Sequence, residues 1–510
     1  MQETTLRWGD GYLFVEPAFP DTLTPKLRYW RRSLDWSEEQ MRRVATGRYE
    51  ELYQVQSWID ESQRYCQRLL TLPGFMHRVK RTLREAGWKY TIHDERTPFP
   101  KPDFAAACKG LYDHQVECAY TAIQSGGGVV ACPTGWGKTH IIKAIVSAFA
   151  PADLQARGTP LVVVTTPDKD ITAKDYEDLK NMLPDREVGL VMSGYNRFSD
   201  DVQVITLDSL HRLNPDEIGI VIVDEVHAAV SDKRTESLLA MRRAARWGVS
   251  ATPSGRFDGR DLVTEGVFGP VVYTRSYSEG VKDGALVPIK VYWVECPEPS
   301  VGLERYERFV TRAGRYRHAV THNEARNALI GDIIKRTPVT KQTLCIMQFL
   351  QQMNMLFPHC GDGVDIVHAE TDAVEIARMK NLYAVTPKER RDIYQRMRTG
   401  SIRKILSTYV YKQGVNFPDL EVVINAGGGG SDIVARQIPG RESRKTAEKQ
   451  QSYLVDFWHP WDRSKDKKGR IIPGPVHQDD QAREKAYSQL GFEQTWVNNV
   501  NQLPFVVTST

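Results

Sequence analysis

Short apolar runs alternate with segments of helical period from about residue 110 to 275, and again from near residue 287. The runs are Gly128–Ala131, Leu161–Thr165, Val202–Thr206, Ile218–Val223 and Gly248–Ser250, then Thr343–Met347, Asp365–His368, Lys404–Ser407 and Glu421–Asn425. Apolar strands separated by helices are typical of parallel sheets covered by helices on both faces. The pattern predicts an α/β chain that holds two such sheets.

The chain is also too long, at 510 residues, for a single hydrophobic core. Before the first set of strands, residues 1–104 predict a smaller α+β accessory domain, with a helix from Phe75, a strand at Lys89–His93 and a Pro-rich boundary at Thr97–Pro102. We expect the parallel-sheet domains at residues 105–280 and 281–510, the latter with a C-terminal extension.

The accessory domain is rich in tryptophan and arginine, with five of the 11 tryptophans. These residues could stack on bases and bind phosphates. Tryptophans equally fill cores, and helical arginines equally lie in water. Both interpretations stay open. The net charge is only +4, so any basic surface must be local.

A glycine-rich segment, Cys132-Pro133-Thr134-Gly135-Trp136-Gly137-Lys138-Thr139, joins the strand at Gly128–Ala131 to a helix expected at His140–Phe149. Small residues let backbone N–H groups converge on phosphate oxygens, and a helix N-terminus favours negative charge. Lys138 would reach the β and γ phosphates, and Thr139 would bind Mg²⁺. The segment predicts a site for ATP and Mg²⁺.

A second motif strengthens that prediction. The apolar run Ile220–Val223 ends in two carboxylates, Asp224 and Glu225. Hydrolysis of a phosphoanhydride needs one carboxylate to hold the metal and another to orient or deprotonate water. Strand ends of a parallel sheet are the usual ligand-binding edge, so both groups are expected beside Lys138.

Together these segments resemble the DExH-box helicases and translocases of superfamily 2. Leu111–Gln115 resembles the upstream glutamine motif, residues 132–139 motif I, Thr165–Pro167 motif Ia, and Thr206–Leu210 the motif that follows it. Asp224–His227 resembles motif II and Ser250–Pro253 motif III. Ser407–Asn416 is similar to motif V, although Gln413 and Asn416 replace its usual acidic residues, and Gln437–Arg444 resembles motif VI.

The resemblance implies two tandem RecA-like domains with ATP between them, and a role for each matching residue. Asp224, Glu225, Lys138, Arg441 and Arg444 are the expected catalytic groups, with Thr139 and Asp224 on the metal. The nucleotide is expected against Gln115, Pro133, Thr134, Gly135, Trp136, Gly137, Lys138, Thr139 and Gly414. His227, Ser250, Thr252 and Gln437 would couple nucleotide state to domain movement, and Thr166, Thr206 and Thr408 would contact nucleic-acid phosphates.

A narrower similarity is to phage UvsW-type recombination helicases and, more distantly, to XPB-type repair helicases. It rests on Leu72–Arg96, Arg326–Ile330, Tyr453–Phe457 and Arg483–Phe492. It implies a motor on branched or duplex DNA, in recombination, repair or fork remodelling. Two alternatives stay open: a nucleic-acid-binding subunit switched by ATP, and the translocase part of a restriction or defence assembly.

Other classes are disfavoured by what the sequence lacks. The first residues hold no basic segment followed by an apolar run, and no apolar stretch approaches the roughly 20 residues that span a bilayer. The seven cysteines form no C-x-x-C pair, so a structural zinc site is not expected. We therefore expect a cytoplasmic protein, in the host cytoplasm if a phage encodes it, with no membrane partner.

Overall fold

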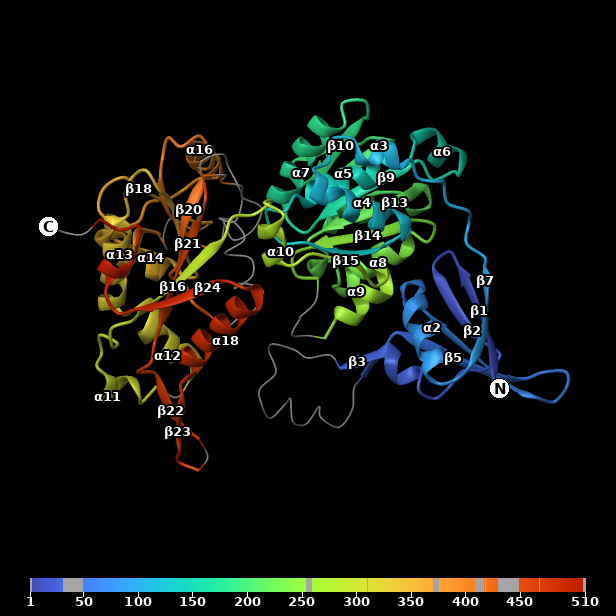
Figure 1. Ribbon diagram of the computed structural model, residues 1–510, viewed down its shortest axis with the longest axis horizontal. Coiled ribbons are helices and arrows are strands. Elements are labelled where there is room, and N and C mark those ends of the chain that lie inside the picture. The colour runs from blue at the N-terminus through green and yellow to red at the C-terminus, as the bar shows by residue number, and fades with distance from the viewer. Residues whose placement is uncertain are drawn as a thin grey trace. The chain divides into compact units, whose positions relative to one another are not determined.

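The computed structural model describes residues 2–30, 49–253, 259–309, 311–369, 376–408, 417, 419–429, 449–466 and 468–507. The chain forms two compact units (Figure 1). One unit holds residues 1–132 and 137–275, and the other holds residues 133–136 and 276–510. The predicted three-domain boundaries stay a prediction.

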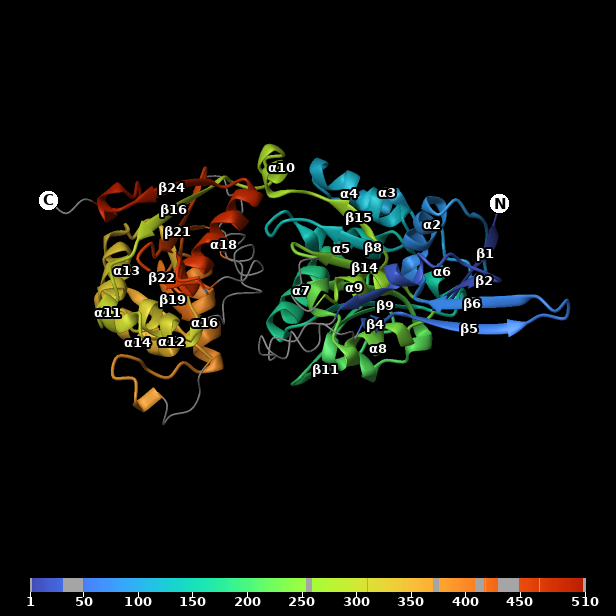
Figure 2. The ribbon, with the colours of Figure 1, turned by 90° about the horizontal axis from the view of Figure 1, so that it is seen from below.

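The N-terminal part of the first unit is an α+β module, as predicted. Its sheet has the order β5-β6-β2-β1-β7. The strands are β1 (Glu3–Gly9), β2 (Tyr12–Glu16), β5 (Tyr53–Ile59), β6 (Tyr65–Thr71) and β7 (Lys89–Asp94). Helix α2 (Met76–Glu85) buries Val79 and Leu83 in the core of this module, at the spacing of one helix face. The β5–β6 hairpin projects from the module (Figure 2).

The turn before α2 docks the module on α9 (Asp261–Phe268) of the parallel-sheet domain. A Cβ atom on Gly74 would lie 2.2 Å from the Glu265 carbonyl oxygen, and one on Gly266 would lie 2.9 Å from Cζ of Phe75. Arg78 Nε donates to Glu265 Oε1 at 2.9 Å. Two glycines therefore permit a backbone approach that any side chain would prevent.

The first large sheet has eight strands in the order β11-β10-β12-β9-β13-β14-β8-β15. Its strands are β8 (Gly128–Ala131), β9 (Leu161–Thr166), β10 (Val188–Met192), β11 (Tyr195–Arg197), β12 (Val202–Thr206), β13 (Ile218–Asp224), β14 (Ala245–Ser250) and β15 (Val271–Thr274). Neighbouring strands run parallel, except that β10 and β11 are antiparallel. This is the predicted parallel-sheet domain.

Helices cover both faces of this sheet (Figure 1). On one face lie α3 (Phe104–Cys108), α4 (Asp113–Gln124), α5 (Lys138–Ser147) and α7 (Lys169–Met182), and on the other lie α8 (Asp232–Ala240) and α9. The expected helix at His140–Phe149 begins two residues earlier, at Lys138. All seven residues of β13 are buried, as a central strand between two helical layers requires.

The second large sheet has seven strands, all parallel, in the order β18-β19-β17-β20-β21-β16-β24. They are β16 (Ile289–Glu295), β17 (Gln342–Met347), β18 (Val364–Val367), β19 (Lys404–Thr408), β20 (Leu420–Asn425), β21 (Ser452–Trp458) and β24 (Glu493–Val497). Its flanking helices include α10 (Tyr277–Lys282), α13 (Glu324–Arg336), α14 (Leu350–Leu356), α16 (Pro387–Arg398) and α18 (Pro475–Leu490). The predicted second RecA-like sheet is confirmed.

Among the residues that the structure describes, no helix has the length and apolar character needed to cross a membrane. The same residues contain no group of three or more His, Cys, Asp or Glu side chains placed to hold a metal ion.

Candidate nucleotide-binding site

The predicted site lies at one edge of the first large sheet. Strands β13, β14 and β8 are neighbours and run parallel, so their carboxyl ends meet at this edge. β13 ends at Asp224, β14 ends at Ser250, and β8 leads into the glycine-rich loop. Three motifs that are far apart in the sequence therefore come together, as the sequence predicts.

The loop has the backbone that close approach to phosphate requires. Gly135 and Gly137 have φ angles of 87° and 104°, which favour glycine. A Cβ atom on Gly137 would lie 2.2 Å from Nε2 of Gln115. Gln115 is buried and its Oε1 accepts from the Tyr112 backbone N–H at 3.2 Å. The predicted adenine-reading glutamine thus lies directly against the phosphate-binding loop.

Residues 133–136 of the loop group with the second unit. There, Trp136 is almost fully buried, and its Cδ1 atom would lie 3.2 Å from a Cβ atom on Gly280 of helix α10. Pro133, Thr134 and Gly135 are half-buried, as is Thr139 at the start of α5. The nucleotide contacts predicted for these residues stay a prediction.

Lys138 faces the two carboxylates of the second motif. Its Nζ lies 3.5 Å from Glu225 Oε1, and both side chains are mostly buried. Burial lowers the pKa of Lys138, but the charges of Glu225 and Asp224 outweigh burial and raise it. Burial and the neighbouring Glu225 raise the pKa of Asp224. The charge of Lys174 also acts on Asp224, but Lys174 is itself paired with Asp175 and Asp178, so the carboxylates still outnumber the lysines and leave an excess of negative charge.

That excess fits a divalent cation. Asp224 and the Thr139 hydroxyl supply oxygen ligands, which Mg²⁺ prefers. The N–H groups at the start of the ten-residue helix α5 and the charge of Lys138 suit a triphosphate. The residues present therefore fit ATP with Mg²⁺.

Glu225 is held by a chain of hydrogen bonds. Ser250 Oγ donates to Glu225 Oε2 at 3.1 Å, and His227 Nδ1 lies 3.0 Å from Ser250 Oγ. Ser250 Oγ also accepts from the backbone N–H of Thr252 at 3.1 Å. The expected coupling residues of the first domain are thus linked directly to the carboxylate expected to activate water.

The backbone of Glu225 is itself strained. Its φ is 53°, and within the described chain Gln63 is the other non-glycine residue with positive φ. Such a conformation costs about 1–3 kcal/mol and persists when surrounding contacts enforce it. Burial raises the pKa of Glu225. The charge of Lys138 and the hydrogen bonds from His227 and Ser250 outweigh burial and lower that pKa overall, which keeps the carboxylate ionised.

A further carboxylate was missed by the sequence analysis. Asp175 of α7 is completely buried beneath the site. Burial and the charge of Asp224 raise its pKa to about 7. Its signal was available, because Asp175 stands at helical spacing between the buried Ile171 and Leu179.

The predicted nucleic-acid contacts lie at strand ends. Thr166 of β9 and Thr206 of β12 are paired in register at the carboxyl edge of the first sheet. Both are buried, and Thr166 Oγ1 donates to the Asp168 carbonyl oxygen at 3.0 Å, while Thr206 Oγ1 lies 2.8 Å from Ser209 Oγ. Thr408, half-buried, ends β19 in the second sheet. Their phosphate contacts stay a prediction.

Four predicted site residues, Gly414, Gln437, Arg441 and Arg444, lie outside the described residues, as do Gln413 and Asn416. The described segment that precedes motif VI is the glycine loop at 427–429, after β20.

A buried polar network holds this loop. Arg483 of α18 donates to the Gly429 carbonyl oxygen at 2.8 Å and to both oxygens of Asp456 at 2.9 Å. Asp456 also accepts from the Tyr487 hydroxyl at 2.8 Å, and Arg326 donates to the Ala426 carbonyl oxygen at 2.9 Å. These side chains come from segments that carry the narrower family similarity, but their sequences do not predict that they meet.

Comparisons with known proteins agree with this geometry. Residues 109–255 match the family model "Type III restriction enzyme, res subunit", and residues 326–446 match the "Helicase conserved C-terminal domain". The DNA 3'-5' translocase XPB2 of Sulfurisphaera tokodaii is 26% identical over 66% of this chain and 79% of its own length.

Two solved structures are also similar. S. cerevisiae Dbp5 bound to RNA and ADP BeF3 matches 77% of this chain and 96% of its own, with 15% identity and a TM-score of 0.52. T4 UvsW matches 98% of this chain and 99% of its own, with 16% identity and a TM-score of 0.41.

The chain spans 55 to 60% of the length of four further curated relatives. The two matched segments occur in order and each falls on a parallel sheet, and in the first sheet the motifs at Asp224 and Ser250 lie at strand ends. The chain belongs to superfamily 2 of the helicases, which are ATP-hydrolysing enzymes.

Proposed function

We propose that this chain is an ATP-dependent DNA translocase or helicase that acts on branched or duplex DNA. The observation that carries the proposal is the bonded chain from Lys138 through Glu225 and Ser250 to His227. It joins the phosphate-binding lysine to residues of two further strand ends. A change at the γ-phosphate can therefore reach the carboxyl ends of β13 and β14, which lie at the same edge of the sheet as Thr166 and Thr206.

Each residue has a role in this proposal. Gln115 reads the adenine edge, the backbone of residues 133–137 cradles the phosphates, and Lys138 neutralises them. Thr139 and Asp224 hold Mg²⁺, which when bound supplies positive charge against the phosphates. Glu225, kept ionised by its neighbours, accepts a proton from the attacking water.

The second helicase segment completes the site. Gly414 of motif V and the motif VI residues Gln437, Arg441 and Arg444 stand at positions that match the family pattern. Arginine carries a fixed charge and a bidentate fork, which suit it to charge developing on a γ-phosphate. Completion of the site by these arginines links ATP state to the position of the domains.

DNA is the proposed track because curated relatives are named DNA translocases or helicases. Thr166, Thr206 and Thr408 are proposed to lie near its phosphates, which suits a machine that steps along any sequence. The UvsW-type and XPB-type similarities suggest recombination, repair or fork remodelling. No membrane partner is proposed, and the place of action is the cytoplasm, of the host if a phage encodes the chain.

A second candidate is the translocase part of a restriction assembly. It is favoured by the restriction-enzyme family model at residues 109–255. The described residues hold no cluster of acidic or histidine side chains that could bind a nuclease metal, so a partner would have to cut. An ATP-driven switch that does not step is the remaining alternative.

Steady-state ATPase assays with single-stranded DNA, forked DNA and RNA test the proposal. We expect DNA to stimulate ATP turnover, and an absence of stimulation by all three nucleic acids would contradict the proposal.

Lys138→Ala and Glu225→Gln should each abolish ATP turnover with the fold intact. Lys143→Ala is a matched control on the same helix, since the Lys143 Nζ donates to the Lys109 carbonyl oxygen at 2.6 Å. Single-molecule tracking on DNA separates a motor from a switch.

A further inference from the structure

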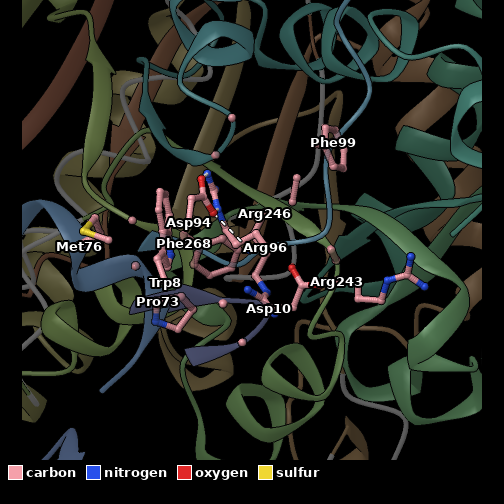
Figure 3. Close-up of a pocket in the computed structure, with 18 of the residues that line it drawn as sticks. Trp8, Asp10, Pro73, Met76, Asp94, Arg96, Phe99, Arg243, Arg246 and Phe268 are labelled. Carbon is pink, nitrogen blue, oxygen red and sulfur yellow. Dashed lines mark hydrogen bonds and ion pairs between the residues drawn. The ribbon is translucent and has the colours of Figure 1, made fainter. Parts of the chain in front are cut away.

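A second cavity lies within the first unit, where the N-terminal module meets the parallel-sheet domain (Figure 3). Its volume is about 620 Å³, within the range of small-molecule sites. Its walls include the β1–β2 turn, the residues just before β8 and those at the start of β14. These strands carry the nucleotide motifs at their other ends, so the two sites lie at opposite edges of one sheet.

The cavity is strongly basic. Its basic lining residues, apart from His77, are Lys80, Arg96, Arg157, Arg242, Arg243 and Arg246. The acidic lining residues are Asp10 and Asp94. Asp94 is paired with Arg96 at 2.6 Å, and Asp10 accepts from the backbone N–H of Thr97 at 3.2 Å. Five cations therefore share the single remaining carboxylate.

Three of these cations are held in place by uncharged groups. Arg246, which is 7% exposed, donates to the Met241 carbonyl oxygen at 2.7 Å. Arg243 donates to the Arg157 carbonyl oxygen at 2.6 Å. Arg157 donates to the Pro98 carbonyl oxygen at 3.0 Å. Carbonyl groups orient a guanidinium without cancelling its charge. Burial lowers the pKa of Arg246 to about 10, against the opposing charge of Asp10.

Lys80 and Arg242 complete the basic wall. Lys80 is half-buried on α2, and Arg242 is exposed before β14, with its Cγ 3.0 Å from where a Cβ of Gly11 would stand. Within the ranges that the structure describes, no carboxylate forms an ion pair with either residue, or with the three buried or half-buried arginines. The cavity thus keeps a net positive charge that a bound anion would offset.

Aromatic groups lie in the same cavity. The guanidinium of Arg96 stacks on Trp8, 3.4 Å from the ring centroid, and Phe99 and Phe268 contribute further lining (Figure 3). Trp8 Nε1 is buried and has no acceptor among the described residues. A buried donor without an acceptor is costly, so a ligand that brings an acceptor would stabilise this wall.

We propose that this cavity binds a phosphate-bearing nucleotide unit, with its phosphate at Lys80 and Arg242 and its base near Trp8 and Phe99. Guanidinium and ammonium groups are the common phosphate ligands, and aromatic rings stack on bases of any sequence. The unit comes either from a nucleic-acid strand or from a free nucleotide. The inference does not depend on translocation by the chain.

Binding to the full-length Lys138→Ala chain tests the proposal, because that background weakens phosphate binding at the glycine-rich loop. The test variant adds Lys80→Ala and Arg242→Ala. The matched control adds Arg64→Ala and Arg81→Ala, which change two mostly exposed arginines of the N-terminal module. The control therefore loses as much positive charge as the test variant. Titration calorimetry with ADP and fluorescence anisotropy with an eight-residue oligothymidylate are measured on both.

If the unit belongs to a strand, the slope of log affinity against log salt for the oligothymidylate should fall by about 1.4 in the test variant relative to the control, for two lost phosphate contacts. If it is free, ADP should bind at least about 10-fold more weakly, a change of about 1.4 kcal/mol. Equal behaviour of test and control with both probes overturns the proposal. Should the test variant not fold, Arg242→Ala alone, at an exposed position, replaces it. ATPase stimulation is measured separately, so either proposal can fail alone.

Discussion

Replacement of Arg483 by methionine is expected to destabilise the second unit more than any surface substitution there. Arg483 is 1% exposed, and its guanidinium donates to both oxygens of Asp456, to Asp480 at 3.1 Å and to the Gly429 carbonyl oxygen. Methionine fills much of the volume but leaves the buried Asp456 without its cation, while Asp480 keeps His459. Removal of one partner of a buried ion pair costs about 3–5 kcal/mol.

The lower end of that range is the expected cost. Asp456 keeps the donors of Asn425 at 3.0 Å and Tyr487 at 2.8 Å, so it is not left bare. For a unit of roughly this size, 1 kcal/mol shifts the melting temperature by about 2–4 °C, which predicts a fall of about 6–12 °C. Adding Asp456→Asn, which removes the stranded charge, should recover at least about 1 kcal/mol.

Differential scanning calorimetry on the full chain measures this shift, and hydrogen exchange in β21 assigns it to the second unit. Arg470→Met is the matched control, because Arg470 is largely exposed and its ion pair with Asp466 should contribute less than about 1 kcal/mol. A transition within about 2 °C of the unsubstituted chain would refute the argument from a buried pair.

Three further outcomes are expected. Ser250→Ala should lower DNA-stimulated turnover more than unstimulated turnover, since it removes the hydroxyl that bonds both His227 and Glu225 and leaves only the direct approach of His227 Nδ1 to Glu225 Oε2 at 3.3 Å; equal loss in paired ATPase assays would contradict this. Burial alone would lower the pKa of His459, but Cys296 and Asp480 raise it from 6.5 to about 9. Its contribution of roughly 3 kcal/mol should therefore be complete below pH 6.5 and lost as pH rises through 9. Urea unfolding of the full chain should follow that slope, and His459→Gln should flatten it. Gly266→Ala should weaken the attachment of the N-terminal module, because the new methyl group would lie 2.6 Å from Leu72 Cδ1 and 2.9 Å from Phe75 Cζ. Limited proteolysis should then cut faster near Leu72, and an unchanged rate would contradict that contact.

The parallel sheets were predictable because their strands are continuous apolar runs. β8 and β12 have the predicted bounds, and β13 extends the predicted run by one residue, to Asp224. The helix after the loop starts earlier than expected because Gly137, with its left-handed φ, lets Lys138 begin it directly. The edge strand β15 was not predicted, since its residues are only partly buried and carry little periodic signal.

Long-range polar contacts were harder to predict. Nothing in the local sequence of Arg483 says that it meets Asp456, because the pairing depends on how α18 crosses the sheet. The N-terminal tryptophans divide between the two open interpretations: Trp8 and Trp88 pack against the module core, whereas Trp58 is 37% exposed on β5. Arg31, Arg32, Arg42, Arg43 and Arg48 lie outside the described residues.

The paired glycines at 74 and 266 have a consequence for how this protein can be altered. An added Cβ at Gly74 would meet the backbone of the facing helix, and one at Gly266 would meet the side chains of Leu72 and Phe75, so size and not polarity decides which residues either position accepts. An accessory module taken from another chain would therefore attach only if it brought its own glycine to that position. Module and motor lobe are expected to be exchangeable as one block, and not separately.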